Sequence, residues 1–179
     1  MVSETNPGGV KVKRLVLPWV IAALLAAGCG GATLKSYTKP DAPWGVINRV
    51  AALPFELPSE NPVQRQMVGN LFAEELRRSW PREVVEVPIS SPVASGLMEM
   101  KQIGKQYRVD AVFSGSIDDA QGTVVHVRLQ DTATEELLWS GTYTLGSRAE
   151  FLSLATQQQQ FQKAFRLLVH RFLSQSASR

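Results

Sequence analysis

The chain has 179 residues, of which 19 are basic, 16 are acidic and one is a cysteine. Three of the basic residues and one of the acidic residues lie in the first 28, so the rest of the chain carries a net charge of +1. That balance excludes the strongly basic surface of a nucleic-acid-binding domain. A single cysteine excludes an intramolecular disulfide.

The first 28 residues have the three-part layout of a secretory signal peptide. Basic residues at positions 11, 13 and 14 precede an apolar run from Leu15 to Ala27, and small residues follow. A helix of this length covers roughly 20 Å, which is short of the roughly 30 Å hydrocarbon core of a bilayer. Pro18 weakens the run further as a permanent membrane span. The segment therefore predicts a signal that is removed.

The end of this segment, Leu24-Leu25-Ala26-Ala27-Gly28-Cys29, resembles the lipobox of bacterial lipoproteins. The resemblance implies cleavage between Gly28 and Cys29 and a lipid, including palmitate, on Cys29. The usual lipobox has leucine three residues before the cysteine, where this chain has Ala26. The alternative is a secreted protein cut near Ala27 with a free thiol, which an oxidising compartment disfavours.

Gly30 follows the cysteine, where an aspartate would retain a lipoprotein at the inner membrane. By resemblance to sorted lipoproteins, we expect the periplasmic face of the outer membrane. Residues 29–45 are rich in small residues, lysine and proline, and are predicted to form a flexible tether. One periplasmic domain is predicted over residues 46–175, which is long enough to bury a core.

Hydrophobic periodicity and turn residues predict the elements of this domain in the order β-α-β-α-β-β-β-α. The expected elements are strands at 46–55, 83–88, 110–117, 123–130 and 136–145, and helices at about 62–80, 97–107 and 148–174. Crossover helices favour parallel neighbouring strands, and the closing hairpins favour antiparallel ones. The predicted fold class is therefore α/β (α+β), with helices packed on a mixed sheet of about five strands.

The first and last helices carry the clearest local signals. Ser59 or Asn61 is expected to cap the first helix, Pro62 suits its first position, and Pro81 ends it. Its expected apolar face consists of Val63, Met67, Leu71, Phe72 and Leu76. The last helix presents Leu154, Phe161, Phe165, Leu168 and Phe172 on one face. We expect that face to pack on the sheet, with docking of a partner as the alternative.

Several segments resemble a periplasmic α/β domain shared by envelope proteins. They are Val-Ala-Ala-Leu-Pro-Phe (50–55), Gly-Asn-Leu-Phe-Ala-Glu-Glu-Leu (69–76), Val-Val-Glu-Val-Pro (84–88), Asp-Ala-Val-Phe-Ser-Gly-Ser-Ile (110–117) and the turn with Leu-Leu-Trp-Ser-Gly (131–141). This pattern is similar to the TolB N-terminal domain, the curli secretion lipoprotein CsgG, the flagella-associated lipoprotein FlgO and the penicillin-binding-protein activator LpoB. The resemblance covers about residues 46–145 and implies docking and assembly.

The sequence offers little support for an enzyme, a cofactor or a metal site. His126 and His170 lie apart, on a predicted strand and a predicted helix, without ligand spacing to one another or to a second cysteine. His126 stands between two valines and is expected to face solvent. The paired carboxylates Asp118-Asp119 and Glu135-Glu136 fall at predicted turns. No nucleophile elbow or phosphate-binding glycine motif occurs, so no catalytic residue, metal ligand or cofactor is predicted.

A surface for a protein partner is the remaining candidate site. Arg77, Arg78 and Arg82 cluster at the end of the first helix, where they either complement the helix dipole or contact an acidic partner or a lipid headgroup. Trp44 and Trp80 flank the first strand and first helix, as core residues or as interface anchors.

These observations predict an outer-membrane lipoprotein that acts as a non-enzymatic accessory or assembly factor by binding envelope proteins. Two alternatives remain open: an LpoB-like activator of a peptidoglycan synthase, and a CsgG-like secretion channel subunit. Curli-type subunits insert two long amphipathic hairpins, whereas the connections here are short, which argues against the channel. The partner, the envelope pathway and homo-oligomerisation are left open.

Overall fold

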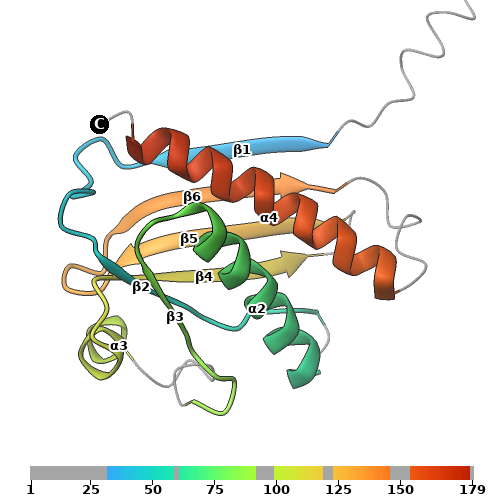
Figure 1. The fold of residues 1–179 in the computed structure, drawn as a ribbon, viewed down its shortest axis with the longest axis horizontal. Helices are drawn as coiled ribbons and strands as arrows, with labels where there is room; N and C mark the ends of the chain where they lie inside the picture. Colours follow the sequence, from blue (N-terminus) through green and yellow to red (C-terminus); the bar gives the residue numbers. More distant parts are fainter. Residues whose placement is uncertain (1–31, 59–60, 92–98, 119–122, 146–153, 178–179) are drawn as a thin grey trace, which may run out of the picture. The chain divides into compact units, whose positions relative to one another are not determined.

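The computed structural model describes residues 32–58, 61–91, 99–118, 123–145 and 154–177 (Figure 1). Their elements are β1 (Thr33–Thr38), β2 (Arg49–Ala52), α2 (Pro62–Ser79), β3 (Glu83–Glu86), α3 (Met100–Tyr107), β4 (Ala111–Asp118), β5 (Val124–Asp131), β6 (Leu137–Thr144) and α4 (Leu154–Ala177). The order from β2 to α4 is the predicted order. None of the described helices is long and apolar enough to cross a membrane.

The strands form one open, mixed sheet in the order β1-β6-β5-β4-β2-β3. β2 pairs in parallel with both β3 and β4, because helices connect these strands along the chain. The remaining pairs, β4–β5, β5–β6 and β1–β6, are antiparallel. The predicted mixed sheet is confirmed, but it has six strands where about five were expected.

The additional strand corrects the predicted tether. Residues 29–45 were expected to be flexible, yet Thr33–Thr38 forms β1 along the edge of β6. The sequence hides this strand because, of the side chains turned toward the helices, only Leu34 is a large apolar one. Hydrogen bonds to α4 complete the packing: Thr38 Oγ1 donates to Gln175 at 3.0 Å, and Arg171 Nε donates to Ser36 at 3.0 Å. The folded domain therefore begins well before residue 46.

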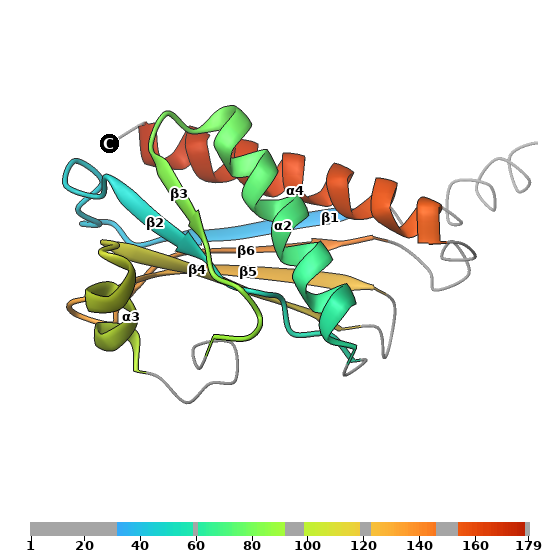
Figure 2. The same cartoon turned by 60° about the horizontal axis from the view of Figure 1, so that its bottom comes forward.

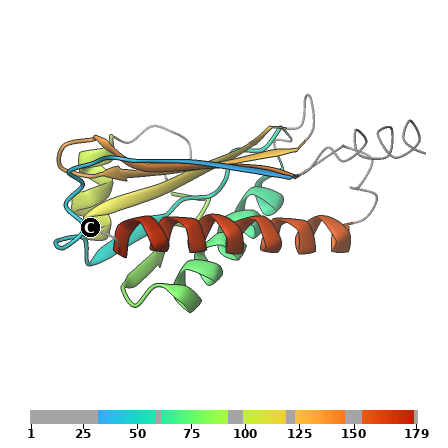
Figure 3. The same cartoon turned by 90° about the horizontal axis from the view of Figure 1, so that it is seen from above.

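Helices α2 and α4 cover one face of the sheet, where the large core lies (Figures 2 and 3). Phe165 is fully buried there, with its ring 5.2 Å from that of Phe55 and 5.4 Å from that of Phe72, centroid to centroid. Phe161, Leu168 and Phe172 of the same helix are also buried. The prediction that the last helix packs on the sheet is confirmed for these residues. The side chain of Leu154 lies outside the described residues.

The start of α2 follows from its sequence. Asn61 caps the helix, since its side-chain oxygen accepts hydrogen bonds from the backbone N–H groups of Val63 at 3.0 Å and Gln64 at 3.3 Å. Pro62, which has no N–H to leave unpaired, takes the first position. The helix ends at Ser79, two residues before Pro81, as expected.

Among the described residues, one helix covers the opposite face of the sheet, at one end. There α3 packs on β2 and β4 through a small cluster that includes Ile103, Ala51 and Val112 (Figure 2). Over β5, β6 and β1, no helix among the described residues lies on this side (Figure 3). We call this uncovered part of the sheet the open face.

Candidate functional site

The arginines predicted as a partner surface have different environments. Arg77 forms an ion pair with Glu86, and its Nε and Nη2 both donate to the carbonyl oxygen of Val84 at 3.3 Å. These bonds join the last turns of α2 to β3. Arg77 therefore holds two elements of the domain together, and most of its hydrogen-bonding capacity is used within the fold.

Arg78 points outward and keeps 63% of its side-chain surface exposed. Its guanidinium lies 3.6 Å from a carboxylate oxygen of Glu74 and 3.8 Å from one of Glu75. The pair with Glu74 is exposed and contributes only about 0.3–0.5 kcal/mol, whereas Glu75 is buried and also lies 3.7 Å from Arg166, so it keeps a partner if Arg78 turns away. Of the three arginines, Arg78 is the one best placed to exchange its intramolecular partners for those of another molecule.

Trp44 and Trp80 are core residues, with exposures of 8% and 7%. The structure decides against the surface-anchor alternative, because both indoles pack edge-on against Phe172, at centroid distances of 5.6 and 5.3 Å. Arg82 contacts both tryptophans of this cluster. Its Nη1 donates to the carbonyl oxygen of Trp44 at 2.7 Å, and its guanidinium carbon lies 5.6 Å from the centroid of Trp80.

The predicted lipidation and cleavage residues, Cys29 and Gly28, lie outside the described residues. Their role stays a prediction. Within the described ranges, no group of three or more histidine, cysteine, aspartate and glutamate side chains is arranged to hold a metal ion.

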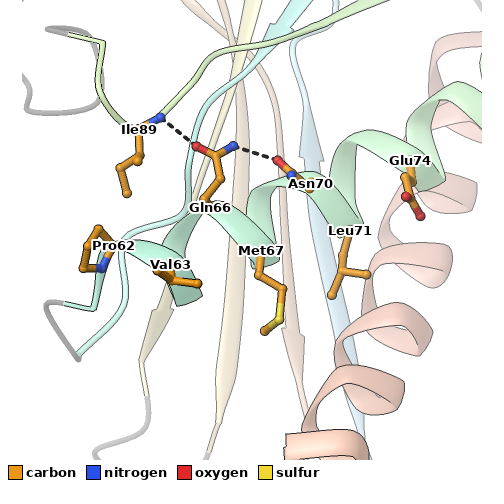
Figure 4. A pocket seen from close by; sticks show the side chains of 8 residues that line it. All are labelled: Pro62, Val63, Gln66, Met67, Asn70, Leu71, Glu74 and Ile89. Carbon is orange, nitrogen blue, oxygen red and sulfur yellow. Dashed lines mark hydrogen bonds between the residues drawn. The ribbon is translucent and has the colours of Figure 1, made fainter.

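A groove of about 620 Å³ runs along the outer side of α2 (Figure 4). It is lined by Pro62, Val63, Gln66, Met67, Asn70, Leu71, Glu74 and Ile89. Within this lining, Gln66 connects α2 to the chain after β3, since it accepts a hydrogen bond from the backbone N–H of Ile89 at 2.6 Å and donates to Asn70 at 2.7 Å (Figure 4). The apolar side chains of this lining remain available for contact with another molecule.

The groove corrects the predicted apolar face of α2. Phe72 and Leu76 are buried as expected, but Val63 is 75% exposed, and Met67 and Leu71 are only partly buried. The core side of the helix instead includes Val68, Gly69 and Ala73. Small residues there allow close approach to the sheet: a Cβ on Gly69 would lie 3.1 Å from backbone atoms of residues 53 and 54. Hydrophobic periodicity alone did not separate the residues of α2 that face the core from the neighbouring residues that line the groove.

The open face is lined by polar side chains in two cross-strand rows. The register places Glu56, Ser116, His126, Thr142 and Lys35 in the first row, and Ser114, Arg128, Ser140 and Tyr37 in the second. A hollow of about 150 Å³ lies between the rows, lined by Glu56, Ser114, Gly115, Ser116, His126 and Arg128. His126 lies on this face, as the sequence predicted, and its Nδ1 is 3.1 Å from the Thr142 hydroxyl.

Reasoning from the sequence missed this second site. Alternation along the strand was recognised, but its polar half was assigned to solvent. The register that brings Glu56 beside Ser116 comes from an isolated parallel bridge. This bridge requires a glycine at position 115. On the core side of the sheet, a Cβ there would lie 2.3 Å from the ring of Phe55, the residue before Glu56.

Elsewhere on the surface, a hydrogen bond to Glu136 raises the pKa of Lys39 above its usual range.

No protein-family model and no curated protein sequence matches this chain. Solved structures do match. PelC from Paraburkholderia phytofirmans, a dodecamer in its crystal, is 16% identical, with 77% of this chain and 97% of that chain covered and a TM-score of 0.54. The chain has a PelC-like fold. At this identity the match shows the fold alone.

Two proteins named by the sequence resemblance are also among the matched structures. TolB from Acinetobacter baumannii is 14% identical over 78% of this chain and 29% of its own, with a TM-score of 0.42. The LpoB C-terminal domain from Salmonella enterica is 14% identical over 70% of this chain and 90% of its own, with a TM-score of 0.35.

Proposed function

We propose that this protein is a lipid-anchored periplasmic lipoprotein of the outer membrane. It acts without catalysis, as an accessory factor that binds another envelope protein. The proposal rests on the signal peptide and lipobox-like segment, and on a folded domain of the PelC type that follows them. The observation that carries the binding role is the α2 groove.

The groove has the composition of a docking surface. Apolar side chains make up most of its lining, and Val63 at its N-terminal end is 75% exposed. Contiguous exposed apolar surface on a folded domain marks sites for protein partners more often than isolated exposed residues do. Glu74 is the charged residue of the described lining, and its ion pair with Arg78 is exposed and weak. A partner segment with apolar side chains and a basic residue that replaces Arg78 in this pair would be complementary.

Chain length limits where this docking takes place. Cys29 precedes the start of β1 at Thr33 by four residues, which span at most about 14 Å when extended. A lipid on Cys29 would therefore keep the sheet edge close to the bilayer. Lipoprotein partners in the same membrane, or periplasmic domains near it, would be within reach.

Photocrosslinking from the groove tests the proposal. A photoreactive phenylalanine analogue replaces Val63 in the groove or, as a matched control, Val46, which is 66% exposed outside the groove lining. After illumination of intact cells, we expect an adduct with one envelope protein from position 63, identified by mass spectrometry, and none from position 46. Equal adducts from both positions, or none from either, would contradict docking at the groove.

Two observations distinguish the alternatives: the identity of the crosslinked protein and the assembly state of the lipoprotein. A peptidoglycan synthase as the crosslinked protein would favour the LpoB-like role, which predicts stimulation of glycan polymerisation in a purified assay. A detergent-stable ring with a pore would favour the channel subunit.

Self-assembly is a second candidate, favoured by the outer edge of the sheet. β1 is a terminal strand of the sheet, and Leu34 and Tyr37 on it are 38% and 49% exposed. An open edge with exposed apolar side chains is a site where a second chain can add. Native mass spectrometry of the detergent-solubilised lipoprotein measures this directly, and a monomer at micromolar concentration would exclude it.

A further inference from the structure

The hollow on the open face brings opposite charges together without pairing them. Glu56 stands beside β4 and Arg128 on β5, in adjacent rows, with Ser114 and Ser116 between them. Two strand spacings of about 5 Å and two residues of about 3.3 Å rise place their Cα atoms roughly 12 Å apart. Both residues are exposed, and side chains on a strand stand roughly perpendicular to the sheet, so the charged groups keep about this separation.

The side chains of this hollow have unused hydrogen-bonding capacity. Among the described residues, Glu56 and Arg128 form no ion pair with each other or with another residue, and neither Ser114 nor Ser116 uses its hydroxyl. By contrast, Arg49 on β2 is paired with Glu83 on β3 at 3.1 Å. The hollow is therefore a place where a carboxylate, a guanidinium and two hydroxyls converge and remain available.

We propose that this hollow binds a short zwitterionic peptide, with the size and charge pattern of a dipeptide. The Glu56 carboxylate accepts hydrogen bonds from the ligand ammonium, and the Arg128 guanidinium donates to the ligand carboxylate. An extended dipeptide is about 7 Å long, and a hydrogen bond of about 2.9 Å at each end brings the span to about 13 Å, close to the separation of the two positions. A purely anionic ligand would be repelled by Glu56, and a purely cationic one by Arg128.

Neutral groups between the charges suit the peptide bond of such a ligand. A serine hydroxyl donates and accepts, so Ser114 and Ser116 are able to pair with both the amide N–H and the carbonyl oxygen. The Nδ1 atom of His126 is held by the Thr142 hydroxyl, which orients the imidazole ring. The Nε2 atom of His126 has no hydrogen bond among the described residues. This site lies across the sheet from α2, so it is independent of partner docking in the groove.

The test is an NMR titration of the full-length lipoprotein in detergent micelles with alanyl-alanine. We expect saturable shifts of the backbone signals of residues 114–116 and 126–128, with a dissociation constant in the millimolar range, about −4 kcal/mol. Glu56→Gln and Arg128→Gln should each weaken binding about threefold to fivefold, as expected for exposed ion pairs. Lys163→Gln, which removes an exposed positive charge from α4, outside this hollow and the groove, should leave binding unchanged.

Blocked ligands assign each charge to its partner. The N-acetylated dipeptide lacks the ammonium, so it should bind more weakly to the unmodified protein and show no further loss with Glu56→Gln. The C-amidated dipeptide should behave in the same way with Arg128→Gln. Absence of saturable shifts up to tens of millimolar would overturn the proposal. Equal binding of blocked and free dipeptides, or full affinity in both variants, would overturn it as well.

Discussion

Removal of one ring from the centre of the core tests how α4 is held on the sheet. Phe165 is fully buried, and its ring lies edge-on to those of Phe55 and Phe72. Burial of a phenylalanine side chain contributes about 1.5–3 kcal/mol. Each aromatic pair adds about 0.5–1.5 kcal/mol. Phe165→Ala should therefore destabilise the fold by about 4 kcal/mol, within the ~3–5 kcal/mol typical of such truncations.

The measurement is urea unfolding followed by circular dichroism and tryptophan fluorescence, together with thermal unfolding. For a domain of this size, about 4 kcal/mol corresponds to a fall in Tm of roughly 8–16 °C. Leu167→Ala is the matched control, because this side chain of the same helix is 38% exposed and should lose less than about 1 kcal/mol. If Phe165→Ala cost no more than Leu167→Ala, α4 would not be part of the core.

Three further predictions test the packing and the anchor. Gly115→Ala should lower the free energy of unfolding by about 1–3 kcal/mol in the same assay, since its Cβ would lie 2.3 Å from the ring of Phe55. Gly45→Ala is the control: a Cβ at position 45 has no atom within 4 Å, so the free energy of unfolding should not change. Arg82→Ala should lower the free energy of unfolding by about 1–3 kcal/mol, because it removes a charged hydrogen bond of 2.7 Å and a cation–π contact. A change below about 0.5 kcal/mol would show that Arg82 does not stabilise the tryptophan cluster. Cys29→Ser should abolish incorporation of a labelled fatty acid and release the protein from the membrane fraction, and retained label would refute lipidation at this residue.

Much of the fold follows from local sequence signals. The cap at Asn61 and the proline after it predict the start of α2, and the structure has the helix there. The turn at Asp131 is also correct, because its carboxylate accepts hydrogen bonds from the N–H groups of Ala133 and Thr134, both at 2.8 Å. These signals succeed because the interactions span only two or three residues.

Long-range features were predicted poorly. Strand β1 lacks alternating apolar residues and is held by β6, more than 100 residues away in sequence. The two tryptophans gave no local sign of burial, which depends on Phe172 and on the closing contact of Arg82. In each case the stabilising partner is distant along the chain.

Local sequence patterns were enough to predict the order of the elements from β2 onward and the mixed sheet, whereas the signal and lipobox-like segment stays a prediction. These follow from composition, periodicity and capping, which act over a few residues. Which residues of α2 face the core and which line the groove became clear from the packing of the helix on the sheet. The tertiary structure also decided that Glu56, Ser114 and Arg128 meet in one hollow. Strand register explains this dependence: a shift of one residue would turn the polar side chains of the shifted strand into the core, and register is fixed by packing across the whole sheet.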